Sequence, residues 1–137
     1  MTKLIFLLAI CYLTLSCNQS SNSTSQNNKS PRVDSAEIDP LEVSPDKYKV
    51  LLDNKFVRVV EYSLKPGEKD NTHTHPPKTS YVVSGGLLRV YPESEKPFDY
   101  EEVKGKAEWA DKRGKHYVEN IGETTVTILL TEIKWVQ

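Results

Sequence analysis

The sequence predicts an all-β domain, and three observations carry that prediction. From residue 48 onwards the chain is a series of short segments rich in Val, Ile, Leu, Thr and Tyr, which are residue types that favour strands. Turn residues such as Asp-Asn, Pro-Gly and Gly-Gly separate these segments. No amphipathic helical pattern follows residue 46. Regular short strands with such turns are typical of a β-sandwich or barrel.

The first two strands are expected at residues 48–53 and 56–64, joined by a turn at Asp53-Asn54. The second alternates well, because one face would carry Phe56, Arg58, Val60, Tyr62 and Leu64. A tight turn follows at residues 65–68, where Pro66 and Gly67 suit the two central positions of a type II turn.

The histidine-containing stretch, residues 72–75, comes next. Pro76 and Pro77 end this stretch or hold it at a sheet edge, because proline cannot donate to a strand ladder. Further strands are expected at residues 81–84, 87–91, 98–103, 107–110, 116–119 and 124–136. Turns are expected at 85–86, 104–106 and 120–123, and loops at 92–97 and 111–115.

The three histidines of the chain, His73, His75 and His116, are the candidate metal ligands. A strand turns alternate side chains to one face, so His73 and His75 would lie together. With His116 supplied by a distant strand, they offer three imidazoles to a divalent transition metal: Fe, Zn, Mn, Ni or Cu. Three protein ligands leave open positions, as in catalytic sites. The alternative is that the histidines are ordinary polar residues.

Two motifs in this order resemble those of the cupins. Gly67-x5-His73-x-His75, followed by Tyr81-Val-Val-Ser-Gly-Gly86, is similar to the first cupin motif. Gly105-x5-Asp111 and then His116-x3-Asn120 are similar to the second. The resemblance covers residues 50–135 and implies a cupin double-stranded β-helix, a jelly-roll barrel, with the three histidines holding the metal.

The chain also departs from the cupin motifs. The first motif usually supplies a glutamate ligand where this chain has Thr79, between Lys78 and Ser80. In the second motif, Asp111 replaces a proline and Arg113 a glycine. The resemblance therefore implies a three-histidine site, which some cupin oxygenases, including thiol dioxygenases, use with Fe(II).

Other polar and aromatic residues near these motifs have less specific expectations. We expect Lys78 to be a solvated charge at the barrel mouth, and Glu119 to lie on the strand face opposite His116 in a structural role. Arg58 and Arg89 could bind a substrate carboxylate if they face inward. Five aromatic residues could form the wall of a pocket, and none is expected to be catalytic: Tyr62, Tyr81, Tyr91, Trp109 and Tyr117.

The N-terminus predicts export and a lipid anchor. Lys3 precedes an apolar run over residues 4–15, and Ser16 precedes Cys17, which resembles a bacterial lipoprotein signal. We expect a signal peptide over residues 1–16, a flexible polar tether over 17–45 and the cupin domain over 46–137. Within the tether, the more mixed segment 31–45 is expected to be extended and laid along the domain surface. Lipidation of Cys17 would anchor the domain to a membrane, facing the periplasm or the cell exterior. An ordinary secretory peptide is the alternative.

Charge and cysteine content limit the remaining function classes. Removal of Lys3 with the signal leaves 17 of 18 basic residues against 19 acidic ones, so no nucleic-acid partner is indicated. Cys11 would leave with the signal, and the folded part then has no thiol nucleophile or ligand. The remaining candidates are a metal-dependent enzyme acting on a small molecule (an oxygenase or isomerase), a non-catalytic module for a small ligand or metal, and a structural scaffold. The sequence leaves a homodimer open.

Overall fold

The computed structural model describes residues 36–134. The predicted signal peptide, Cys17 and most of the predicted tether lie outside these residues. The described part contains one short helix and nine strands: α1 (Pro40–Val43), β1 (Tyr48–Asp53), β2 (Val57–Leu64), β3 (His73–His75), β4 (Lys78–Ser84), β5 (Gly86–Pro92), β6 (Phe98–Glu102), β7 (Ala107–Ala110), β8 (Arg113–Asn120) and β9 (Val126–Ile133).

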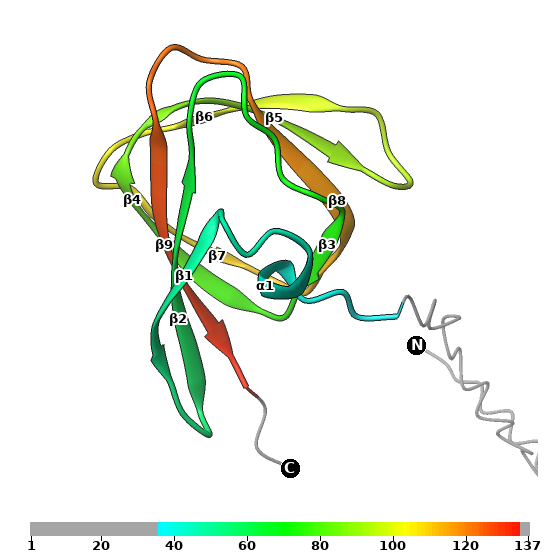
Figure 1. The fold of residues 1–137 in the computed structure, drawn as a ribbon, viewed down its shortest axis with the longest axis vertical. Helices are drawn as coiled ribbons and strands as arrows, with labels where there is room; N and C mark the ends of the chain where they lie inside the picture. The colour runs from blue at the N-terminus through cyan, green and yellow to red at the C-terminus, as the bar shows by residue number, and fades with distance from the viewer. Residues whose placement is uncertain (1–35, 135–137) are drawn as a thin grey trace, which may run out of the picture. The chain divides into compact units, whose positions relative to one another are not determined.

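The strands form two antiparallel sheets. One sheet has the order β1-β2-β9-β4-β7 and the other the order β3-β8-β5-β6. In Figure 1, β3, β8, β5 and β6 follow the right and top of the domain, opposite β1, β2 and β9 on the left. The predicted all-β jelly-roll barrel is therefore confirmed.

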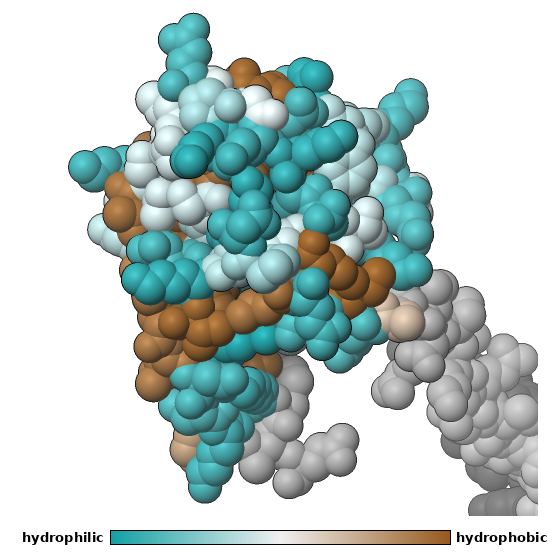
Figure 2. Space-filling model, viewed as in Figure 1, coloured by the Kyte–Doolittle hydropathy of each residue, from teal (hydrophilic) through white to brown (hydrophobic). Residues whose placement is uncertain are grey.

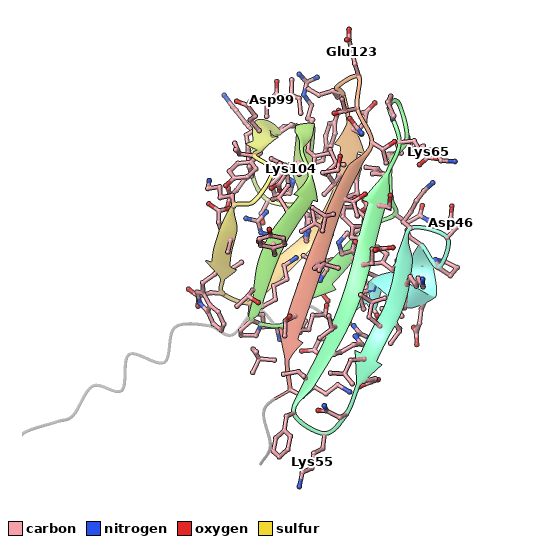
Figure 3. All side chains as sticks on the ribbon, turned by 90° about the vertical axis from the view of Figure 1, so that its left-hand side faces the viewer. Asp46, Lys55, Lys65, Asp99, Lys104 and Glu123 are labelled. Atoms are coloured by element: carbon pink, nitrogen blue, oxygen red, sulfur yellow. The ribbon has the colours of Figure 1, made fainter. Side chains whose placement is uncertain are left out.

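The barrel core lies on the inner face of β2 and β9. These two strands pair over their full eight residues, and Figure 3 shows β9 between β2 and β4. Alternate side chains of both strands are buried: Val60, Tyr62 and Leu64 in β2, which belong to one predicted alternating face, and Val126, Ile128 and Leu130 in β9. Apolar burial of this kind is the main stabilising contribution to such a domain.

The turn between β2 and β3 has the expected form. Gly67 has φ of 76°, which the second central position of a type II turn requires. The amide of Glu68 donates to the carbonyl oxygen of Lys65 at 3.0 Å and closes the turn.

Two strands begin earlier than the sequence indicates, and both extensions reach polar residues. β4 begins at Lys78 rather than at residue 81, because residues 78–81 pair with β9 on one side and β7 on the other. β8 begins at Arg113 rather than at residue 116, because Arg113 pairs with His75 of β3. Backbone pairing on neighbouring strands thus overrides the polar character of these residues.

The segment before β1 packs on the domain. The amide of Ile38 donates to Oγ1 of Thr74, and the amide of Thr74 donates to the carbonyl of Ile38, both at 2.9 Å. Asp39 caps α1 through the amide of Leu41, and Pro40 is buried. Residues 38–45 therefore lie against the domain, as expected for this segment, and include the short helix α1.

One edge of the larger sheet is apolar. β1 is an edge strand, and Val50, Leu51 and Leu52 are each more than two-fifths exposed. Figure 2 shows apolar surface on the lower half of the face on which β1 and β2 lie in Figure 1. A homodimer stays a prediction. Within residues 36–134, no helix has the length and apolar character needed to cross a bilayer.

Candidate metal centre

The three histidines meet inside the barrel. β3 supplies His73 and His75, and β8 supplies His116, which pairs directly with His73. One nitrogen from each ring can be chosen so that all three lie within 4.8 Å of one another, and Nε2 of His73 is 3.0 Å from Nε2 of His75. All three side chains are buried. The predicted convergence of these residues is confirmed.

Strand alternation explains why the first two histidines point the same way. His73 and His75 flank Thr74 in β3, and alternate residues of a strand share a face. Thr74 is turned toward the segment before α1, where its hydroxyl donates to the carbonyl oxygen of Ile38 at 3.2 Å. The covering segment buries the outer side of β3, and this makes all three of its residues buried.

Each imidazole is oriented by an acceptor at its Nδ1 atom. Nδ1 of His73 is 2.8 Å from the carbonyl oxygen of Asn71, and Nδ1 of His116 is 2.8 Å from that of Gly114. Nδ1 of His75 is 2.9 Å from Oε1 of Glu132. These oxygens can only accept, so Nδ1 carries the proton and the lone pair of each ring is on Nε2. Metal-binding histidines are usually held in this way, so the residues fit a divalent ion.

Burial also keeps the rings neutral. It lowers the pKa of His73, lowers that of His75 well below its ordinary value, and lowers that of His116 to about 3. Among further causes, the positive charge of Lys78 lowers the pKa of all three. Neutral imidazole is the form that binds a metal.

These pKa shifts predict that the metal-free protein loses stability in acid. As the pH falls below about 6.5, the unfolded chain takes up protons at His116 that the folded protein cannot, since its folded pKa is about 3. We expect this residue alone to cost about 2 kcal/mol of unfolding free energy between pH 7 and pH 5. Urea unfolding in the presence of a chelator measures it. His116→Asn should show a shallower pH dependence, and an unchanged slope would contradict the assignment.

A buried ion-pair network lies on the Nδ1 side of His75. Oε2 of Glu132 accepts from the guanidinium of Arg58 at 2.6 Å, and the same guanidinium donates to both oxygens of Asp39, at 2.7 and 3.1 Å. Sequence reasoning missed Glu132, although strand alternation places it on the inner face with Ile128 and Leu130. Arg58 faces inward, but its guanidinium is bound to Glu132 and Asp39 and does not line the cavity described below.

A second buried carboxylate lies beside His73. Oδ1 of Asp70 accepts from the amide of Val118 at 2.6 Å, and Oδ2 accepts from the hydroxyl of Tyr62 at 2.9 Å. The hydroxyl of Tyr48 is 3.4 Å from Oδ2 of Asp70 and 3.3 Å from Nε2 of His73. Burial raises the pKa of Asp70. Neither Asp70 nor Tyr48 carried a signal in the sequence that connected it to the histidines.

The histidines open onto a cavity of about 270 Å³. Tyr62 and Trp109 line it, as do Lys78 and Arg113. Lys78 is half-buried on the cavity wall rather than solvated, and Arg113 is exposed. Thr79, at the position where the cupin motif has glutamate, is exposed and does not line the cavity. Alternation explains this, because Lys78 and Ser80 take the inward positions.

Several other candidates lie away from this cavity. Arg89 pairs with exposed Asp99 at 2.6 Å and does not line the cavity, so the inward orientation that substrate binding would require is not met. Tyr81 is exposed. Tyr91 and Tyr117 stack with their ring centroids 4.4 Å apart and do not line this cavity. Glu119 accepts a hydrogen bond from Tyr91 at 2.8 Å, which agrees with its expected structural role.

Comparison with known proteins shows the fold. No protein-family model matches the sequence, and no curated protein does either. A cupin domain from Bordetella pertussis is 22% identical, with a TM-score of 0.60 over 64% of this chain and 92% of that one. A cupin family protein with a double-stranded β-helix fold from Methanocaldococcus jannaschii is 16% identical, with a TM-score of 0.53 over 64% and 78%. The fold is the cupin double-stranded β-helix that the two motifs imply.

Proposed function

We propose that the domain holds one divalent transition metal on His73, His75 and His116 and is a metal-dependent enzyme acting on a small molecule. One observation carries this proposal: each of the three rings has an acceptor at Nδ1, so the three Nε2 lone pairs are free for a common ion. The Nε2 lone pairs of His73 and His75 face each other at 3.0 Å, and they repel each other unless a cation or a proton lies between them.

The ligand set favours chemistry at the ion over a closed structural site. Among residues 36–134, no fourth His, Cys, Asp or Glu joins the cluster. The nearest carboxylate, Glu132, is occupied by His75 and Arg58. Three protein ligands leave coordination positions for a substrate, as in catalytic metal sites, and the cavity gives a small molecule access to them. An oxygenase or an isomerase fits such a site.

The residues around the site have separable roles in this proposal. Such an ion, when bound, supplies Lewis acidity and, for a redox-active metal, electron transfer. Glu132 and the two backbone carbonyls hold the imidazoles in orientation. The Tyr48 hydroxyl, 3.3 Å from Nε2 of His73 and also able to donate to Asp70, is positioned to donate a hydrogen bond to a bound substrate.

Metal reconstitution tests the proposal. The purified protein is treated with chelator, then loaded with Fe(II), Zn(II), Mn(II), Ni(II), Cu(II) or Co(II) in turn, and analysed for metal content. We expect about one ion per chain and, for the Co(II) form, a change in visible absorption when azide is added, because azide takes an open position. A protein that stays metal-free would overturn the proposal. A spectrum indifferent to azide would favour the alternative of a non-catalytic capture module.

The membrane anchor belongs to the same proposal. A lipid on Cys17 and the polar stretch after it would hold the metal domain near a membrane surface, facing the periplasm or the cell exterior. Support comes from the N-terminal sequence, which has a basic residue, an apolar run and a small residue before the cysteine.

A further inference from the structure

The cavity beside the histidines carries two cationic side chains on opposite sheets. Lys78 begins β4 in the five-stranded sheet, and Arg113 begins β8 in the four-stranded sheet. Both line the cavity that contains His73, His75 and His116. After burial, the positive charge of Lys78 is the largest cause of the lowered pKa of His75, and Lys78 and Arg113 are lesser causes of the lowered pKa of His116. Both charges therefore act on the space in front of the metal ligands.

Neither cation has an anionic partner in the described part of the chain. No salt bridge within 4.0 Å joins Lys78 or Arg113 to a carboxylate of residues 36–134. Lys78 is the cross-strand neighbour of Glu132, but the two oxygens of that carboxylate bind Arg58 and His75. Burial lowers the pKa of Lys78 to about 8, although the charges of Glu132, Glu102 and Asp70 act in the opposite direction.

The cavity carboxylates are too far from Lys78 or are otherwise engaged. Glu108 binds the ammonium of Lys106 at 2.7 Å and the hydroxyl of Tyr100. Glu102 lines the cavity but lies beyond ion-pair distance of Lys78. A divalent ion on three neutral imidazoles would add further positive charge next to the two cations. An anion in this part of the cavity would compensate all three charges.

We infer that the site takes a small carboxylate, held between the ammonium of Lys78 on the cavity wall and the guanidinium of Arg113, with its other end toward the histidine cluster. The cavity of about 270 Å³ fits a molecule of a few carbon atoms, since pockets for drug-sized ligands are mostly larger. Half-buried Lys78 should contribute more than exposed Arg113, because solvent screens the latter. This assignment names the substrate class for the proposed function and rests on it.

Calorimetric titration with malonate and its neutral analogue malonamide tests the inference. The protein is used both loaded with Zn(II) and metal-free. We expect malonate to bind and malonamide not to bind. Lys78→Met should weaken malonate binding about tenfold and Arg113→Met about threefold, because each removes a charge-assisted contact. Lys112→Met is the matched control, since exposed Lys112 pairs with Glu37 at 2.7 Å outside the cavity.

The outcomes separate this inference from the proposed function. If Lys78→Met and Arg113→Met change neither the zinc content nor the malonate affinity of the Zn(II) form, the inferred carboxylate site is overturned and the metal centre is not. Equal affinity for malonate and malonamide would overturn the inferred carboxylate site too. If the protein takes up no metal but binds malonate in a way that Lys78→Met weakens, the inferred carboxylate site is supported and the proposed metal centre is overturned. Metal content and melting temperature show whether each variant is folded.

Discussion

Replacing His75 with alanine should lower the affinity for a divalent metal by more than about 100-fold, a larger loss than substitutions that only orient a ligand produce. His75 offers Nε2 beside that of His73 at 3.0 Å, so its removal leaves two ligands. Three neutral imidazoles are the whole set of ligands that the described residues supply. Two such ligands from one protein do not hold a borderline metal against a chelator or water.

Competition with a chromogenic chelator measures this affinity, and thermal unfolding gives a second readout. The wild-type protein at a metal concentration of 100 times Kd should gain about 2.7 kcal/mol of stability, and the His75→Ala protein should gain almost none. Thr79→Ala is the matched control, because Thr79 is exposed at the position where a cupin glutamate would be expected. Retained metal affinity in His75→Ala, or its loss in Thr79→Ala, would show that the ion is held elsewhere.

The positions of the histidines could be predicted from the sequence through strand alternation and through the resemblance to the two cupin motifs. Alternation in a strand places His73 and His75 on one face wherever that strand lies. The second motif then supplies His116 from a strand that pairs with the first. The same alternation groups the residues of β2 that are buried, whereas the jelly-roll barrel follows from the resemblance to the cupin motifs.

The residues that support and surround the histidines could not be predicted, because they depend on the register between distant strands. Glu132 meets Arg58 only because β2 and β9 pair in one particular register across 74 positions of sequence. Lys78 and Arg113 line the cavity because pairing extends β4 and β8 into polar residues that resemble loop sequence. The one available signal was a glutamate, Glu132, on the same strand face as Ile128 and Leu130. This signal does not tell which residue Glu132 binds.

Glu132→Gln should be the most destabilising single substitution in the network behind the metal centre. Glu132 is 2% exposed and Arg58 17% exposed, and removal of one partner from a buried pair leaves an uncompensated charge that costs about 3–5 kcal/mol. Asp39 still binds the guanidinium of Arg58, so we expect about 3 kcal/mol. Urea unfolding of the metal-free protein measures this cost. Asp99→Asn, in an ion pair that is about two-fifths exposed on each side, should cost less than about 1 kcal/mol.

Glu132→Gln should also weaken metal binding. This effect would show that Glu132 orients the imidazole of His75 and does not only stabilise the fold through its ion pair. The carboxylate accepts the Nδ1 proton of His75 at 2.9 Å, whereas a glutamine amide must present its donor side either to that proton or to Arg58. We expect a 10- to 100-fold loss of metal affinity. Arg58→Met removes the other end of the network but leaves the carboxylate on His75. If Arg58→Met and Glu132→Gln lower metal affinity equally, Glu132 acts through packing rather than by orienting the imidazole.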